Sequence, residues 1–141
     1  MRVMVFVKGD TEPGQLPPEE MLAEMAEYNE ELSKAGVMLD GNGLHPSAEG
    51  VRVSFDTDGK PSVTDGPFAE SKELVAGYWM LQVKSLEEAI EWVKRAPFRS
   101  SEEYGEAEIE IRPVFELDEF GDSPAIEQHR KLAEELDKKR S

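Results

Sequence analysis

Hydrophobic and polar positions along the chain follow two periods, one typical of strands and one of helices. Residues 3–7 and residues 75–83 are continuous apolar runs, so each is predicted to be a strand buried on both faces and central in its sheet. At residues 51–55 apolar and polar side chains alternate, which predicts a strand with one wet face. The same alternation at 109–115, with Pro113 inside it, predicts an edge strand.

Three other segments have helical spacing. A helix is predicted within residues 17–36, because proline favours the first helical turn and glycine favours the end. Ser85 and Glu88 have the spacing of a capping box, which predicts a helix that stops at Pro97. The last helix, within 122–141, has an apolar stripe too narrow to hold a free helix in water. It is therefore expected to pack on the domain edge or on a neighbouring subunit.

The order of these elements predicts an α+β fold. A short strand at 37–39 is followed by a glycine-rich breaker, and a hairpin is inserted before the second apolar run. Without that hairpin the order is βαββαβ, the ferredoxin-like arrangement, in which both helices cover one face of an antiparallel sheet. Residues 1–121 are predicted to form this domain, and residues 122–141 an appended amphipathic helix.

The second face of the sheet also needs a cover, because both central strands are apolar throughout. Packing between two copies would bury that face, so the chain is predicted to form a homodimer, a dimeric α/β barrel. In the alternative, the hairpin and the tail helix of a single chain fold over the same face.

Composition narrows the functional classes. The 141-residue chain carries 31 Asp and Glu against 16 Lys and Arg, a net charge of −15. Such a field repels phosphates and anionic membranes, so neither nucleic acid nor membrane is expected as a partner. There is no Cys, which excludes disulfides and thiol catalysis. No run reaches the roughly 20 apolar residues of a membrane span, and a cytoplasmic protein is predicted.

The loop at 65–73, with the sequence DGPFAESKE, is the candidate site. Asp, Gly and Pro in succession favour a sharp reversal of the chain. The loop then brings ionisable side chains to the mouth of the apolar strand at 75–83. A small-molecule site is therefore predicted in a cleft beside this loop.

His45 and Asp65 are the predicted acid/base pair. An imidazole beside a carboxylate is a common proton shuttle, because histidine changes charge near working pH. The structural alternatives are that His45 bonds a local carbonyl and that Asp65 only holds the turn.

Four further residues are predicted to bind a ligand. Phe68 and Trp79 would provide aromatic walls, and Lys72 and Arg112 would hold a carboxylate or phosphate. The alternatives are core packing for the rings and ion pairs with neighbouring glutamates for the cations. No phosphate-cradling or dinucleotide motif occurs, and two distant His residues without Cys disfavour zinc. Neither a cofactor nor a metal is expected.

Several stretches carry a resemblance to a known family. They are residues 39–46 (LDGNGLHP), 65–73, 76–79 (AGYW), 108–112 (EIEIR), 115 and 120–121. From residue 3 to about residue 121 the chain resembles the YCII-related family, in the branch named for its Asp-Gly-Pro-Phe motif. The resemblance implies a ferredoxin-like fold and a dimeric α/β barrel.

The same resemblance implies less about activity. Members of the family are mostly uncharacterised and are often encoded beside extracytoplasmic-function sigma factors. For another branch an enzymatic role was proposed from a His and Asp pair in a cleft, with the His on the first helix. That helix here carries Met25, Tyr28 and Asn29, so a pair would have to be rebuilt from His45 and Asp65.

Two functions are predicted as alternatives. The first is a small-molecule enzyme that performs proton transfer, such as isomerisation or elimination, with Lys72 as an anion clamp. The second is a non-catalytic ligand-binding or regulatory module that acts through a protein partner.

Overall fold

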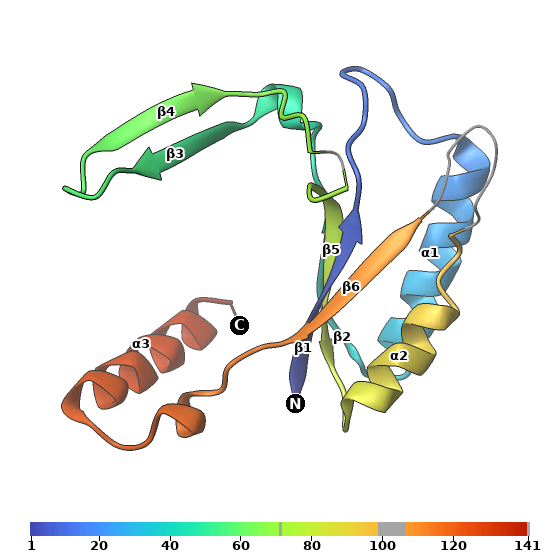
Figure 1. The fold of residues 1–141 in the computed structure, drawn as a ribbon. Coiled ribbons are helices and arrows are strands. Elements are labelled where there is room, and N and C mark those ends of the chain that lie inside the picture. Colours follow the sequence, from blue (N-terminus) through green and yellow to red (C-terminus); the bar gives the residue numbers. More distant parts are fainter. Residues whose placement is uncertain (71, 99–106, 141) are drawn as a thin grey trace.

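The computed structural model describes residues 1–70, 72–98 and 107–140, which form a mixed α+β structure (Figure 1). Its main sheet is antiparallel and has the order β2-β5-β1-β6. The strands are β1 (Arg2–Lys8), β2 (Met38–Gly43), β5 (Val75–Gln82) and β6 (Glu108–Pro113). Helices α1 (Glu19–Lys34) and α2 (Leu86–Lys94) cover one face. This arrangement is compatible with the predicted ferredoxin-like fold, and the predicted central strands β1 and β5 are confirmed as neighbours.

The core lies between this sheet and the two helices. Every second residue of β1 and β5 points toward the helices, and Val3, Val5 and Leu81 are at most 1% exposed. The alternate residues point the other way and are only half-buried, so the two strands are not buried on both faces in the single chain. We call this second surface the open sheet face. Its central residues are Met4, Phe6, Tyr78 and Met80.

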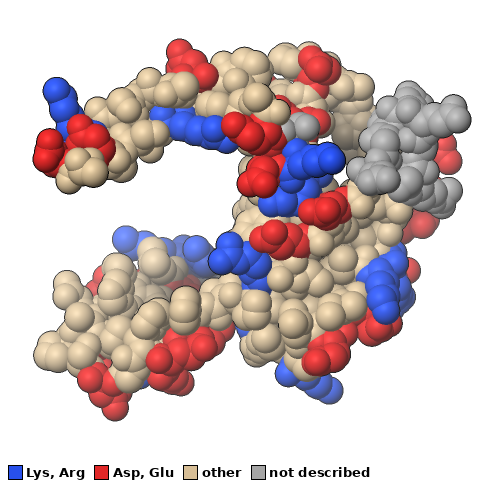
Figure 2. Space-filling view, viewed as in Figure 1, with Lys and Arg blue, Asp and Glu red and all other residues tan. Residues whose placement is uncertain are grey.

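Two arms extend from the sheet on the side of the open sheet face (Figure 1). One is the hairpin of β3 (Val51–Phe55) and β4 (Pro61–Asp65), and the other is helix α3 (Pro124–Arg140). A hollow separates them (Figure 2). Every residue of both hairpin strands is exposed, so the predicted half-buried strand has two wet faces here. The arms do not fold over the sheet, which contradicts the single-chain alternative for covering it.

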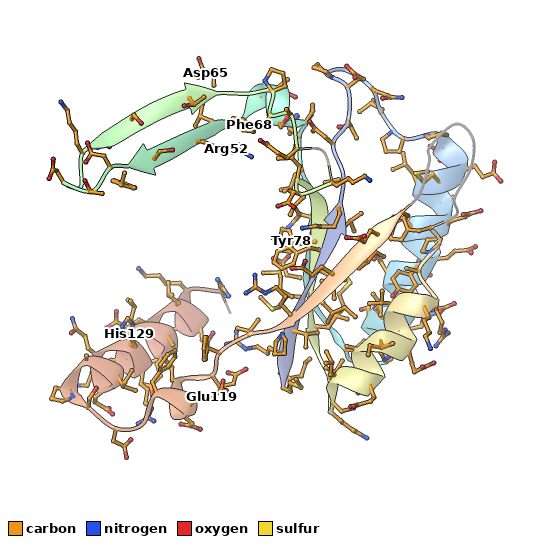
Figure 3. All side chains as sticks on the ribbon, viewed as in Figure 1. Arg52, Asp65, Phe68, Tyr78, Glu119 and His129 are labelled. Carbon is orange, nitrogen blue, oxygen red and sulfur yellow. The ribbon has the colours of Figure 1, made fainter. Side chains whose placement is uncertain are left out.

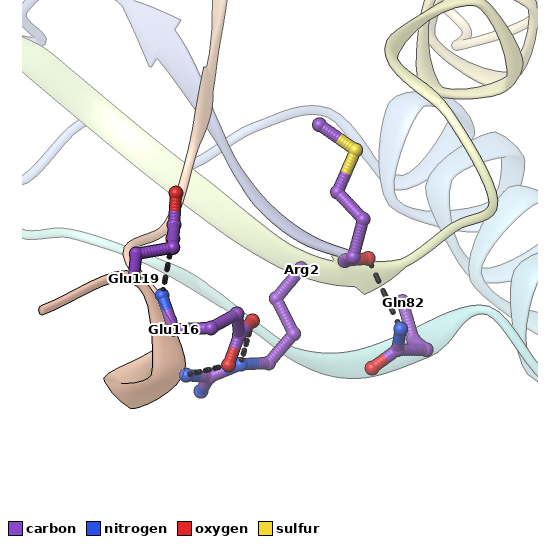
Figure 4. Close-up of polar contacts among 5 residues, drawn as sticks. Arg2, Gln82, Glu116 and Glu119 are labelled. Atoms are coloured by element: carbon purple, nitrogen blue, oxygen red, sulfur yellow. Dashed lines mark hydrogen bonds and ion pairs between the residues drawn. The ribbon is translucent and has the colours of Figure 1, made fainter. Parts of the chain in front are cut away.

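An ion pair fastens the α3 arm to the sheet (Figure 4). The Nε and Nη2 atoms of Arg2 donate to the Glu116 carboxylate at 3.0 and 3.2 Å. This contact lowers the pKa of Glu116 and raises the pKa of Arg2. The Glu119 carboxylate in turn accepts the backbone N–H of Glu116 at 2.6 Å, at the start of the short 3-10 helix η2 (Leu117–Phe120).

Strand β2 continues through the glycine-rich segment at 40–43 that was expected to break it. The glycines serve close packing instead. A Cβ atom at Gly41 would lie 2.7 Å from the Cδ1 atom of Trp79, and one at Gly77 would lie 3.1 Å from the carbonyl oxygen of Asn42. Both glycines therefore let β2 and β5 approach beside the Trp79 ring.

Candidate functional site

The loop at 65–73 braces the hairpin against the short 3-10 helix η1 (Ser47–Glu49). Gly66 lies so close to Ser47 that a Cβ atom would overlap the Ser47 carbonyl oxygen. The Gly66 N–H donates to the carbonyl oxygen of Gly50 at 2.9 Å, and the Phe68 N–H donates to Ser47 Oγ at 3.2 Å. The motif thus fixes the position of η1.

Asp10, in the segment after β1, completes this brace. Its carboxylate accepts the Ser47 hydroxyl at 2.5 Å and the Ser47 backbone N–H at 2.8 Å. The hydroxyl hydrogen bond, helped by the backbone one, lowers the pKa of Asp10. Ser47 therefore ties three segments together, and we call Asp10, Ser47, Gly66 and Phe68 the Ser47 brace.

The charged side chains of the loop are exposed. The Arg52 guanidinium lies over the Phe68 ring, 3.8 Å from its centroid, and pairs with Glu70 at 3.5 Å (Figure 3). Asp65 lies on the outer side of the hairpin (Figure 3). Lys72 is exposed. The loop is therefore exposed to solvent, and its contacts are with neighbouring segments of the chain.

A cavity of about 660 Å³ lies beside β2 and β5, and Met25 and Asn29 of α1 also line it. The segment at 11–17, which leads into α1, forms one wall of this cavity, and the loop after β2 forms another. Its walls are mostly apolar, with a few polar groups, as in many small-molecule sites. The apolar walls include Val7, Leu16, Pro17, Met25, Trp79 and Phe98.

Asn29 and Trp79 meet in this cavity. The Trp79 indole Nε1–H donates to Asn29 Oδ1 at 2.9 Å. The Trp79 ring is held edge-on by Tyr28 and Phe98, at centroid distances of 5.6 and 6.2 Å. Trp79 is 7% exposed, so its orientation is set by the residues packed around it.

His45 and Glu49 meet at the cavity's edge. Both line it, and His45 Nδ1 lies 3.0 Å from Glu49 Oε2. The two side chains are 84% and 51% exposed, so the pair sits at the mouth and not in the interior. A carboxylate at this position can orient the imidazole and leaves Nε2 as the second nitrogen for a ligand.

The predicted site residues are thus divided between surfaces. His45 and Trp79 line the cavity, while Asp65, Phe68 and Lys72 are not among the described residues of its lining. Among the described residues no hydrogen bond or ion pair joins His45 and Asp65: His45 contacts Glu49, and Asp65 lies at the end of β4, outside the cavity lining. Arg112 is opposite Met4 in register, on the open sheet face.

Sequence reasoning missed Glu49 and Asn29. The spacing of four residues between His45 and Glu49 was an available signal, since such spacing brings side chains together in a helical turn. For Asn29 no local signal existed, because its partner Trp79 is 50 positions away in sequence.

The sequence was compared with models of known protein families. The YCII-related domain family matches residues 1–118. The chain belongs to the YCII-related family. No curated protein matches it significantly. In this YCII-related chain the Asp-Gly-Pro-Phe segment is accounted for by the Ser47 brace.

Within residues 1–70, 72–98 and 107–140, no three His, Asp or Glu residues gather in a way that could hold a metal ion. In the same part of this YCII-related chain, no helix is long and apolar enough to cross a bilayer.

Proposed function

We propose that this YCII-related chain binds a small organic molecule in the cavity beside β2 and β5, and that His45, oriented by Glu49, transfers a proton at its mouth. The observation that carries the proposal is the position of the His45–Glu49 pair at the edge of an apolar cavity. The hydrogen bond to Glu49 occupies Nδ1 and leaves Nε2 to act on a bound molecule.

The Ser47 brace supports this proposal from outside the cavity. Ser47 and Glu49 belong to the same 3-10 helix, so holding Ser47 also holds Glu49 beside His45. The loop at 65–73 would then support the reaction by holding Glu49 in place, without contacting the ligand. This replaces Asp65 by Glu49 as the proposed partner of His45.

Binding without catalysis is the second candidate, and the exposure of His45 favours it. A side chain that is 84% exposed works in water-like surroundings, where electrostatic interactions are weaker than in a closed site. In that case the chain is a ligand-binding or regulatory module, and the cavity is its sensor site.

A panel of neutral, anionic and cationic fragments tests both candidates. Fragments that bind the folded state raise the melting temperature, and each such fragment is then incubated with the protein in D₂O. Proton transfer would appear as loss of a C–H signal by exchange with deuterium. We expect His45→Gln to slow this exchange at least 100-fold without abolishing binding.

His129→Gln is the matched control, because His129 lies on the exposed α3 arm (Figure 3). Exchange that is equal in His45→Gln and in the wild type would contradict the catalytic role. Binding without any exchange would favour the module. A panel in which no fragment stabilises the protein would contradict both.

We further propose that two copies pack through the open sheet face as a homodimer of barrel form. The face has an apolar centre and charged residues at its edges, which is the composition of many interfaces. Lys8 and Glu110 pair there at 3.8 Å, while Arg112 has no ion pair among the described residues.

The two arms support the same assembly. On the hairpin, Val53 and Phe55 are 51% and 69% exposed, and on the α3 arm Phe115 and Leu132 are 69% and 52% exposed. A two-stranded hairpin is marginal in water by itself, and so is a lone helix of this length. A second copy that packs against the arms would cover apolar side chains that the single chain leaves exposed.

A further inference from the structure

Resting on the proposed cavity site, we infer that its ligand is an uncharged, largely apolar molecule with a hydrogen-bond acceptor, such as a carbonyl oxygen, that meets the amide nitrogen of Asn29. The observation that leads to this class is the hydrogen bond between Trp79 Nε1 and Asn29 Oδ1. It determines which atom of the Asn29 amide is left for a ligand.

The orientation of the Asn29 amide follows from the chemistry of its partner. An indole N–H can only donate, so the Asn29 atom that faces it has to be the oxygen. The other amide atom is therefore the NH₂ group, which only donates. Among the described residues Nδ2 has no hydrogen-bond partner.

That NH₂ group is also reachable. No buried side-chain nitrogen or oxygen lacks a partner in the described part of the chain, so the unpartnered Nδ2 atom is accessible. Asn29 lines the cavity. A ligand that offers an acceptor can therefore satisfy Nδ2, whereas a ligand that offers only donors cannot.

The charges around the cavity disfavour an anion. Neither Lys nor Arg is among the described residues that line it, whereas Glu49 is. The chain as a whole carries a net charge of −15. An anionic group would lose its hydration without gaining a cationic partner, which is costly in an apolar cavity. The predicted anion clamp at Lys72 does not fit this lining.

Four naphthalene compounds of similar shape serve as probes: 2-acetylnaphthalene, 2-ethylnaphthalene, 2-naphthoate and 2-naphthylmethylamine. Their affinities are measured at neutral pH by titration, with quenching of tryptophan fluorescence as the signal. We expect the ketone to bind about tenfold more tightly than the hydrocarbon, and the carboxylate to bind most weakly. This comparison uses the wild-type chain and depends on no variant.

Asn29→Asp then tests the donor itself. The carboxylate still accepts the Trp79 indole but replaces the NH₂ donor by an acceptor, so ketone affinity should fall about tenfold and hydrocarbon affinity should change little. Gln128→Glu is the matched control. It makes the same amide-to-carboxylate change at an exposed position of the α3 arm, outside the cavity lining.

The outcomes separate the inference from the proposed function. If the carboxylate or the amine binds as tightly as the ketone, or if Asn29→Asp and Gln128→Glu weaken the ketone equally, the ligand class is wrong while cavity binding stands. If none of the four compounds binds, the cavity site and the ligand class are both overturned.

Discussion

Tyr28 is a single residue whose burial changes its pKa. Its ring is 5% exposed, and its hydroxyl donates to the Trp92 carbonyl oxygen at 2.6 Å. Burial disfavours the phenolate and raises the pKa of Tyr28 to about 12. The hydrogen bond joins α1 to α2 on the covered face of the sheet.

This arrangement predicts a loss of stability at high pH. The pKa of Tyr28 is higher in the folded state than the ordinary value of 10.0, so its stabilising effect is complete below that pH and is lost as the pH rises toward 12. At pH 8 we expect Tyr28→Phe to be about 1 kcal/mol less stable than the wild type, because the hydrogen bond is lost. Urea unfolding between pH 8 and pH 12 measures the gap, which should shrink above pH 10. A gap that stays constant would contradict the assignment.

At the scale of elements, the Ser47 brace decides where η1 and the hairpin meet. Asp10 and Phe68 are brought to Ser47 from two segments far apart in sequence. Gly66 is needed at this junction for space, since its φ angle is not in the left-handed region. The motif that drew attention as a site is therefore explained by packing.

Gly66→Ala should consequently be costly. The added methyl group meets backbone that has little room to move, and we expect a loss of about 3 kcal/mol. Gly43→Ala is the control, because a Cβ atom there meets nothing within 4 Å, and it should change stability by less than about 0.5 kcal/mol. Urea unfolding measures the change in stability of each variant. Faster hydrogen exchange of the β3 and β4 amides would show that the loss of structure is in the hairpin. Equal free energies of unfolding for the two variants would show that the Ser47 brace does not stabilise the fold.

The elements could be predicted from sequence where their pattern is local. The apolar runs at 3–7 and 75–83 predicted the two central strands, and Ser85 caps α2 by accepting the Glu88 N–H at 3.1 Å, as its spacing predicts. Which residues of the first run face the core was not visible in sequence, because all five are apolar and only Val3 and Val5 are buried. Glu88 does not close the box on Ser85, since its carboxylate accepts the N–H of Lys84 instead. Which backbone N–H a carboxylate accepts depends on local geometry, and sequence spacing does not determine it.

The site was harder to predict, because its contacts join distant segments. Trp79 was expected to bind a ligand, and it does line the cavity, but Asn29 reaches it only after α1 packs on the sheet. His45 was correctly placed in a loop, yet its neighbour is Glu49 and not Asp65. The direction in which the hairpin leaves the sheet was not visible in sequence, because it depends on the contacts of Ser47 with Asp10 and Phe68.

At the scale of the whole molecule, the open sheet face and the two arms are the surfaces that the single chain leaves uncovered (Figure 1). The centre of the face contains Phe6, which lies opposite Tyr78 in the register of β1 and β5. Tyr78 in turn donates to Asp40 at 3.0 Å, at the edge of the face. A charge at position 6 would therefore enter the proposed interface at its apolar centre.

If the proposed dimer forms, Phe6→Asp should convert it to a monomer. A buried, unpaired carboxylate at the interface is expected to weaken association by more than 100-fold, which light scattering after size exclusion would report as a halved mass. Ala23→Asp, on an exposed position of α1, adds the same charge away from the interface and should leave the dimer intact. A wild-type chain that runs as a monomer would contradict the assembly outright.

The central claim is that a small molecule binds beside Trp79, and the two tryptophans of the chain allow a direct test. Trp79 lines the cavity, whereas Trp92 lies on α2 with Arg95 over its ring. In a ¹H–¹⁵N spectrum, titration with 2-acetylnaphthalene should shift the Trp79 indole signal in a saturable way and leave the Trp92 signal in place, with Trp92→Phe used for assignment. A Trp79 signal that does not move, or two indole signals that move together, would contradict the claim.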